Sequence, residues 1–382
     1  MIDRRQLLAG GAALALSGSL KAAAPGSLAA MAEAKGIRFG SAIGKENFAD
    51  PAYRALNAAQ CGLAVPESEM KWVALRPDAA RFDFRSADTI VRWARNGGLG
   101  VRGHTLLWHF ERWMPEWTRT HDYGRNPAQE ARRLLTTHVD TVARRYSGTV
   151  DSFDVVNEGI DPDTGLIRET VLSKPIGGEA TIDLAFQTAR TAAPKAELVY
   201  NDFMSWRADD ARHRNAVLRL LEGMMKRGTP VTALGVQSHL GSKYSEAPTG
   251  LGALDETAWR RFLDEVIGMG LDLLVTELDV HDNPLPSAIG PRDREVAAHT
   301  RAYLDLMLSY KECRTVMCWG LGDRYSWLQP LRPRPDHLPK RPLPFDADLH
   351  PKPMRDAIAA AFAGAAIREP TASILIPPRS KA

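Results

Sequence analysis

The chain has 382 residues, of which 44% are hydrophobic and 25% are charged. This is the composition of an ordinary globular protein, and it excludes a collagen-like, coiled-coil or largely disordered chain. Because 49 Lys and Arg nearly balance 46 Asp and Glu, the net charge is only +3, and bulk charge predicts no nucleic-acid partner. The chain is rich in Trp, with nine residues. Such large flat side chains suit either a large core or the apolar faces of sugar rings.

The N-terminal segment has the pattern of an export signal. Arg4 and Arg5 precede an apolar run over 7–20, and three alanines and Pro25 follow shortly after it. The run is too short to cross a bilayer, which takes about 20 apolar residues. The paired arginines resemble a twin-arginine signal, although ordinary secretion stays open. We therefore predict a secretion signal over 1–24, an exported protein (periplasmic or extracellular), and no membrane contact after its removal.

The chain has three cysteines, Cys61, Cys313 and Cys318. An odd number in an exported protein excludes a disulfide scaffold, which would need several pairs. Cys318 lies in an apolar run typical of a buried strand, but a bond between Cys313 and Cys318 stays open.

Short apolar runs bounded by turns alternate with amphipathic stretches along the chain. The predicted strands are 39–42, 63–65, 101–106, 152–156, 198–200, 233–236, 273–276 and 316–319. Helices are expected between them, most clearly over 128–145 and 295–309, where apolar residues recur at helical spacing. Eight strand–helix units predict a single-domain (β/α)₈ TIM barrel over 25–364, with 365–382 as a loosely ordered tail. An open doubly wound sheet is the alternative, but no Gly-rich phosphate loop follows the first strand.

Polar and aromatic residues gather where the predicted strands end, which is where such a barrel carries its active site. Glu158 and Glu277 each follow an apolar run, and a pair of carboxylates is the usual apparatus for hydrolysing a glycosidic bond. One must keep its proton and the other must be ionised, so their surroundings must differ. We expect Asn157 to hold a sugar 2-hydroxyl, and His239 and Asp279 to form a hydrogen-bonded chain that keeps Glu277 charged.

The sequence resembles the family 10 glycoside hydrolases, the endo-β-1,4-xylanases. The resemblance runs from about residue 36 to 362, and it is the joint order of the motifs that is specific. The matching segments are 67–72 (ESEMKW), 102–109 (RGHTLLWH), 154–158 (DVVNE), 201–203 (NDF), 235–240 (GVQSHL), 276–280 (TELDV), 319–323 (WGLGD), 325–327 (YSW), 345–346 (FD) and 351–353 (PKP).

The resemblance implies a retaining enzyme that acts on xylan and xylo-oligosaccharides. Glu158 would be its general acid/base and Glu277 its nucleophile, with their carboxyl groups about 5–5.5 Å apart. His239 and Asp279 would orient and tune Glu277. No cofactor, no metal, no nucleic acid and a monomeric state are expected. The implied substrate-binding residues are Glu67, Lys71, His104, Trp108, Asn157, Gln237, His239, Trp319 and Trp327.

Several positions depart from the family pattern. Ser68 stands for the usual Asn beside the second glycone sugar, Glu111 for a common Gln, Phe203 for Tyr and Gly322 for Thr. Two extra residues also follow His109. None of these changes touches the catalytic pair, so they bear on specificity. Ser68 and Glu111 would either weaken the binding of plain xylose units or accommodate a decorated sugar.

Other readings of the sequence stay open or are disfavoured. A barrel that cuts another β-1,4-glycan, such as glucan or mannan, would share the mechanism, and a non-catalytic sugar-binding barrel would be expected to lack one of the two glutamates. His104 and His109 match no zinc-binding motif, and no Gly-x-Ser-x-Gly elbow is present. The Arg- and Pro-rich stretch 332–341 is predicted to be a solvated loop, or else a contact for acidic side groups of glucuronoxylan.

Overall fold

The computed structural model describes residues 24, 26–241, 254–331 and 333–369. All eight predicted strands are present. A two-residue strand that was not predicted pairs with the end of the strand that contains 273–276. The strands are β1 (Arg38–Ile43), β2 (Leu63–Pro66), β3 (Gly100–Trp108), β4 (Ser152–Asn157), β5 (Glu197–Asp202), β6 (Ala233–Val236), the short β7 (His239–Leu240), β8 (Asp272–Val280) and β9 (Cys313–Cys318).

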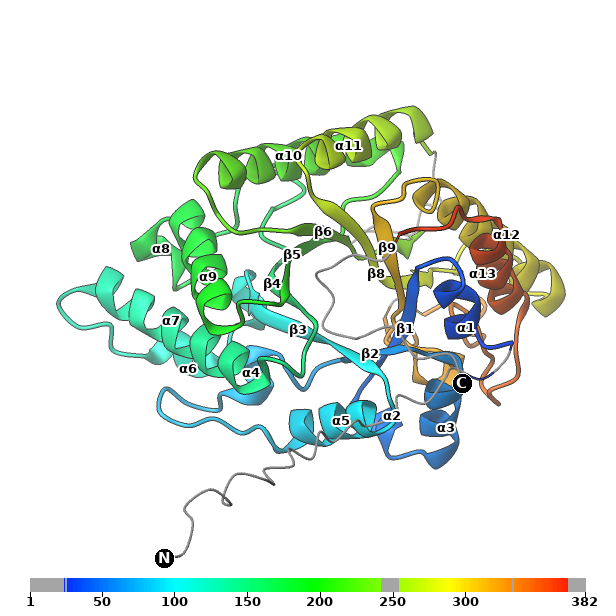
Figure 1. The fold of residues 1–382 in the computed structure, drawn as a ribbon, viewed down its shortest axis with the longest axis horizontal. Coiled ribbons are helices and arrows are strands. Elements are labelled where there is room, and N and C mark those ends of the chain that lie inside the picture. Colours follow the sequence, from blue (N-terminus) through cyan, green and yellow to red (C-terminus); the bar gives the residue numbers. More distant parts are fainter. Residues whose placement is uncertain (1–23, 25, 242–253, 332, 370–382) are drawn as a thin grey trace, which may run out of the picture.

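The strands form a closed parallel barrel. Neighbours pair in sequence order from β1 to β6, β6 pairs with β8, and β9 closes the ring between β8 and β1. Almost every strand residue is buried, as expected for a parallel sheet covered by helices outside and filled by side chains inside. The strands lie in the middle of the molecule and the helices surround them (Figure 1). The predicted (β/α)₈ barrel is therefore confirmed.

The outer layer consists of helices with one apolar face against the barrel. Its long members are α3 (Pro51–Gln60), α5 (Arg85–Asn96), α7 (Pro127–Tyr146), α9 (Gly178–Ala192), α10 (Ala211–Lys226), α11 (Glu256–Gly268), α12 (Ile289–Met307) and α13 (Pro353–Gly364). Shorter turns are α1 (Leu28–Glu33), α2 (Lys45–Phe48), α4 (Trp72–Leu75), α6 (Glu116–Thr120), α8 (Ser173–Ile176), η1 (Glu111–Trp113), η2 (Ala208–Asp210) and η3 (Asp323–Tyr325).

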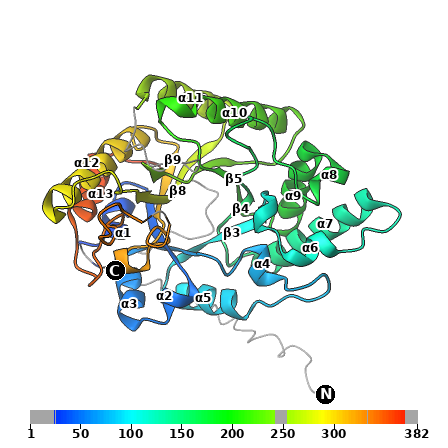
Figure 2. The same cartoon turned by 180° about the vertical axis from the view of Figure 1, so that it is seen from behind.

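Local sequence explains where these helices begin. At α7 the Asn126 side chain accepts a hydrogen bond from the backbone N–H of Gln129 (3.2 Å), and Pro127 occupies the first helical position. Both features favour a helix N-terminus. At the other end of the chain α13 packs beside α12 and α1, as the views from both sides show (Figures 1 and 2). The first and last described helices therefore pack directly against each other.

The predicted signal and the predicted tail lie at the two ends of the chain. The predicted signal over 1–24 lies almost entirely outside the described residues, as does the predicted tail after residue 369. Before that point Arg368 is buried, and its guanidinium donates to the carbonyls of Cys313 (2.9 Å) and Leu308 (3.0 Å). All three cysteines are buried free thiols. None of the described helices is long and apolar enough to cross a membrane.

Candidate active site

The two carboxylates singled out in the sequence lie at the same end of the barrel. Glu158 directly follows β4, Glu277 lies in the second half of β8, and both are 4% exposed. The backbone N–H of Glu158 donates to the carbonyl of Asn201 (2.9 Å), and that of Glu277 donates to the carbonyl of Gln237 (2.8 Å). Each carboxylate is thus fixed by the neighbouring strand, so the barrel sets their relative position.

The backbone of Glu158 adopts a left-handed conformation, with φ of 55°. This region is uncommon for a residue with a side chain, and such residues concentrate at functional sites, where the surrounding structure enforces them.

Amide side chains join the two carboxylates in one hydrogen-bond network. The Nδ2 group of Asn201 donates both to Asn157 Oδ1 (2.8 Å) and to Glu277 Oε1 (2.8 Å). The Nε2 group of Gln237 donates to Glu158 Oε1 (3.0 Å) and approaches Asn157 Oδ1 at 3.2 Å. Asn201 was not among the predicted site residues, because its role as a bridge depends on two partners far away in the sequence.

Glu277 faces a histidine that is held by a second acid. His239 Nε2 lies 3.2 Å from Glu277 Oε2, and His239 Nδ1 lies 2.9 Å from Asp279 Oδ1. Trp327 Nε1 donates to the other oxygen of Asp279 at 2.8 Å. Burial acts to lower the pKa of His239, but the charges of Asp279 and Glu277 outweigh it and raise the pKa to about 10. His239 is therefore an imidazolium at neutral pH.

The same contacts act on the nucleophile candidate. Burial by itself would raise the pKa of Glu277, but the hydrogen bond from His239 and the nearby imidazole charges outweigh it, so this pKa is lowered. The pKa of Glu158 is raised instead, first by burial and further by the carboxylates of Asp202 and Glu277. The two glutamates are thus driven apart, one towards the ionised form and one towards the protonated form.

An aromatic and basic wall lies beside this network. Lys71 Nζ lies 4.8 Å from the ring centre of Trp108 and 5.9 Å from that of Trp319. The ring of His104 meets Trp319 edge-on at 5.1 Å, and His104 Nδ1 lies 2.9 Å from Asp154 Oδ2. Aromatic faces beside hydrogen-bonding groups are what a sugar chain requires.

Glu67 completes the wall next to Lys71. Burial raises the pKa of Glu67 to about 7, although the charge of Lys71 opposes this, and Asn47 Nδ2 lies 3.4 Å from Glu67 Oε2. Every predicted substrate-binding residue therefore belongs to one connected set. That set is Glu67, Lys71, His104, Trp108, Asn157, Gln237, His239, Trp319 and Trp327.

Positions that depart from the family pattern have different surroundings. Ser68 is exposed. The Phe203 ring packs against the buried His213 with ring centres 4.7 Å apart. At Gly322 a Cβ would lie 2.8 Å from Leu349 Cδ2, so the missing side chain lets Leu349 pack closely.

The segment between His109 and Met114, where two extra residues were predicted, carries an aromatic that was not among the predicted site residues. It contains η1, where Trp113 stacks on Trp108 with ring centres 4.8 Å apart while remaining 41% exposed. Glu111 of the same turn accepts a hydrogen bond from the backbone of Val171 (2.7 Å) and lies 4.0 Å from Arg119. In the sequence Trp113 is only one more Trp after the predicted third strand, and its stacking on Trp108 depends on the fold.

The two histidines that are close in sequence, His104 and His109, do not share a partner. His104 contacts Asp154, whereas His109 Nε2 lies 2.9 Å from the carbonyl of Arg168, so the two histidines have separate partners.

In the stretch 332–341, residue 332 lies outside the described residues, and 333, 335 and 337–339 are exposed, but two arginines pair within the fold. Arg334 is buried and lies 3.7 Å from Asp282 Oδ2, and Arg341 forms two hydrogen bonds of 2.8 Å with Asp293. The prediction of a solvated loop is wrong for these two arginines, because Arg334 pairs with the nearby Asp336 (2.7 Å) as well as lying near Asp282, and Arg341 pairs with Asp293.

Three exposed or half-exposed residues form a cluster of side chains of the kinds that bind metal ions. Ligand atoms of Asp346, Asp348 and His350 lie within 4.8 Å of one another. However, Asp346 Oδ1 already accepts the backbone N–H groups of Asp348 and His350, each at 2.9 Å. This is an ordinary turn in which an aspartate caps the backbone.

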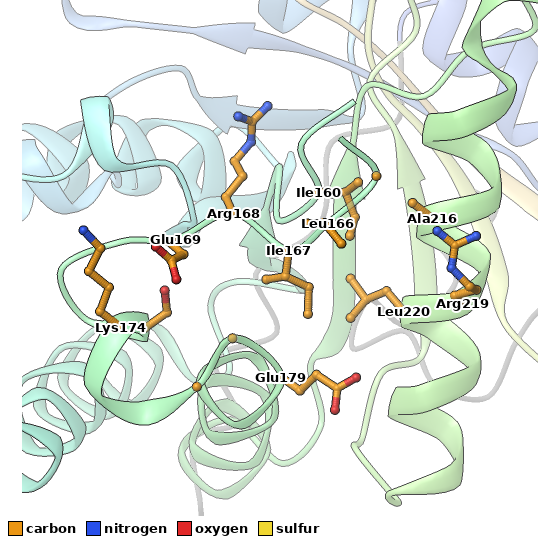
Figure 3. Close-up of a pocket in the computed structure, with 14 residues that line it drawn as sticks. Ile160, Leu166, Ile167, Arg168, Glu169, Lys174, Glu179, Ala216, Arg219 and Leu220 are labelled. Carbon is orange, nitrogen blue, oxygen red and sulfur yellow. The ribbon is translucent and has the colours of Figure 1, made fainter. Parts of the chain in front are cut away.

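A cavity of about 530 Å³ lies between the segment after β4, the start of α9 and α10 (Figure 3). Its apolar part includes Ile160, Ile167 and Leu220, while Lys174 and Arg219 lie on opposite sides of it. Neither catalytic candidate and no aromatic side chain lines it. It therefore lacks the features of the sugar-binding wall.

Two buried carboxylates with opposite pKa shifts, set among aromatic rings at the mouth of a (β/α)₈ barrel, define a glycoside hydrolase. Comparison with known proteins identifies the family. The model of glycosyl hydrolase family 10 matches residues 27–361, and the chain belongs to this family.

Relatives and solved structures agree with this assignment. Endo-1,4-beta-xylanase 3 of Hypocrea jecorina is 30% identical over 322 residues, covering 84% of this chain and 81% of the relative. Endo-1,4-beta-xylanase B of Thermotoga neapolitana is 28% identical over 336 residues, covering 87% and 90%. The crystal structure of xylanase 10B from Thermotoga petrophila in complex with xylobiose superposes with a TM-score of 0.78 at 28% identity, covering 88% of this chain and 97% of that one.

Proposed function

We propose that this protein is an endo-1,4-β-xylanase that hydrolyses internal bonds of xylan with retention of anomeric configuration. Membership of glycosyl hydrolase family 10 and the xylanases among its relatives support the activity. The observation that carries the mechanism is the opposite perturbation of two buried glutamates joined by one amide network. Glu158 is the general acid/base and Glu277 the nucleophile.

In the first step Glu277 attacks the anomeric carbon while Glu158 gives its proton to the departing glycosidic oxygen. The bond to the leaving sugar breaks and a glycosyl ester of Glu277 forms. In the second step Glu158 takes a proton from water, the water oxygen attacks the anomeric carbon, and Glu277 leaves as a carboxylate. Both steps require carboxyl groups about 5–5.5 Å apart.

The surrounding residues have separate tasks. Asn157 binds the 2-hydroxyl, a contact that strengthens as positive charge develops on the sugar ring. His239 and Asp279 keep Glu277 ionised and oriented. The remaining candidates bind the glycone sugars, and Trp327, held by Asp279, would exclude sugars bearing a C5 hydroxymethyl group.

We further propose that the protein is exported by its N-terminal signal over 1–24 and acts as a monomer on xylan and xylo-oligosaccharides. The residues after the barrel would form a short tail.

Proton NMR of the mature protein acting on xylohexaose, read within the first minutes, tests the proposal. Initial release of the β-anomer is expected. Initial α-anomer would keep the hydrolase but overturn Glu277 as nucleophile. Cleavage of β-1,4-glucan or mannan oligosaccharides with xylohexaose left intact would replace the substrate, and binding of any of these without products would replace the enzyme with a sugar-binding barrel.

A further inference from the structure

A second histidine–aspartate pair lies behind Glu158, and the mechanism above gives it no task. Asp202 ends β5 and is fully buried. Its Oδ2 accepts a hydrogen bond from the Tyr200 hydroxyl at 2.6 Å, and its Oδ1 accepts one from the backbone N–H of Phe203 at 2.8 Å. His213 of α10, also fully buried, places Nε2 3.1 Å from Asp202 Oδ1. A buried ion pair of this kind is costly to form unless its charges are well supported.

Two structural connections join this pair to Glu158. The carbonyl of Asp202 accepts the backbone N–H of Gln237 (3.0 Å), and the Gln237 side chain donates to Glu158 Oε1 (3.0 Å). On the other side, a Cβ on Gly159 would lie only 3.1 Å from the Tyr200 hydroxyl oxygen. The hydroxyl that supports Asp202 therefore packs directly against the residue that follows Glu158.

The carboxylate of the pair acts on Glu158, and the imidazole of His213 acts on that carboxylate. After burial and the opposing hydrogen bond from Gln237, the carboxylate of Asp202 is the strongest charge acting on Glu158, and it raises the Glu158 pKa, as Glu277 also does. Burial lowers the pKa of His213, but the charge of Asp202 outweighs it and raises the pKa to about 10. The imidazolium of His213 therefore offsets part of the negative charge of Asp202 throughout the neutral range.

The other charged groups around the pair are few. Asp210 Oδ1 lies 3.7 Å from His213 Nδ1 and supports the cation from α10's own N-terminal side. The charge of Arg168 acts to lower the pKa of Tyr200. Lys71 interacts electrostatically with both Glu158 and Glu277. None of these contacts Asp202 at hydrogen-bonding distance among the described residues. The balance between Asp202 and His213 therefore contributes, beside Glu277, to the negative charge that Glu158 experiences.

We propose that Asp202 and His213 are a positioning pair for the acid/base, in which the carboxylate keeps Glu158 protonated and the imidazolium limits that effect, so that together they set the pH range in which Glu158 can deliver its proton. The proposal rests on the proposed role of Glu158. Neither residue needs to touch substrate, because both act through the charge and the backbone next to Glu158.

Two variants test the pair, Asp202→Asn and His213→Gln, measured as pH profiles of kcat/KM for xylohexaose. The basic limb of this profile reports deprotonation of the acid in the free enzyme. Removing the negative charge in D202N should move the basic limb to lower pH, whereas H213Q leaves Asp202 uncompensated and should move it to higher pH. The same direction for both variants, or no shift in either, would overturn the proposal. If one variant does not fold, the sign of the other decides.

Two controls separate this role from a structural one. Asp151 is a buried acid paired with Arg38 at 2.8 Å, at the start of β4 and away from the cleft, so D151N should leave the basic limb in place. An aryl xylobioside with a good leaving group needs no proton, so D202N and H213Q should keep its kcat/KM within about threefold of wild type. Equal losses on both substrates would contradict the pair's role. If E158A retained the wild-type rate on xylohexaose, the proposed acid itself would fail, which is a different outcome.

Discussion

Replacing Asp279 by Asn tests how the barrel keeps its nucleophile ionised. Asp279 lies 2.9 Å from His239 Nδ1, and His239 Nε2 lies 3.2 Å from Glu277, so a single change of charge should propagate through one imidazole. Asn has nearly the same shape as Asp and can still accept the Trp327 N–H. The substitution therefore removes the charge and keeps most of the packing.

The size of the effect follows from the pKa of His239, about 10 against an ordinary 6.5. This difference corresponds to about 5 kcal/mol in favour of the imidazolium, and Asp279 makes the largest favourable contribution. Without Asp279, burial favours the neutral ring, and Glu277 loses a charge-assisted hydrogen bond of about 1.5–3 kcal/mol. We expect kcat/KM at pH 6 to fall roughly 10- to 150-fold.

The pH dependence has a definite sign. Because His239 holds the pKa of Glu277 low, losing the imidazolium raises the pKa of Glu277, and the acidic limb of kcat/KM should move to higher pH. The raised pKa of His239 also contributes stability that is complete below about pH 6.5 and is lost as the pH rises through about 10. The difference in unfolding free energy between wild type and D279N should therefore shrink above neutral pH.

Stopped assays of xylohexaose cleavage between pH 4 and 9, with urea unfolding at pH 6 and 10, measure both effects. D151N is again the matched control, since it removes a buried paired carboxylate elsewhere in the barrel. An acidic limb that stays in place, or a loss of activity that is the same at every pH, would refute the link from Asp279 through His239 to Glu277.

Three further substitutions follow from the same geometry. Glu277→Ala should abolish release of sugars from xylan while circular dichroism shows a folded barrel; a near-normal rate would exclude Glu277 as nucleophile. Glu158→Ala should lower kcat/KM on xylohexaose about 10²- to 10⁴-fold but leave an aryl xylobioside with a good leaving group far less affected, and equal losses on both would argue against the acid role. Trp113→Ala removes a ring stacked on Trp108, worth about 0.5–1.5 kcal/mol, so KM for xylohexaose should rise about two- to tenfold. An unchanged KM there would mean that the stack does not shape the cleft.

The barrel itself was predictable because its signals are local. Each strand is a short apolar run bounded by turns, and eight of them alternate with amphipathic helices such as α7, whose cap is visible in the sequence. The predicted strands 39–42 and 101–106 fall inside β1 and β3, which are somewhat longer. The two-residue β7 was not predictable, because it exists only through pairing with the end of β8.

The site was predictable to the extent that its residues follow strands directly. Glu158 follows β4 and Gln237 follows β6, so the topology alone brings such positions to one end of the barrel. Bridges and buried ion pairs were not predictable in the same way. Asn201 links residues from two other strands, and the buried Arg334 donates to the backbone carbonyl of Asp282, 52 residues away. Their roles depend on distances between strands and loops that no local pattern contains.

The two glutamates have the same residue types behind them, in opposite order. Behind Glu277 the histidine comes first: His239 contacts the carboxylate, and its own acid lies beyond it, so Glu277 meets a positive charge. Behind Glu158 the order is reversed, because His213 lies beyond Asp202, and the negative charge of Asp202 adds to burial in raising the pKa of the glutamate. Since a cation favours the ionised carboxyl and an anion the protonated one, this reversal supports the proposed roles of Glu277 as nucleophile and Glu158 as acid.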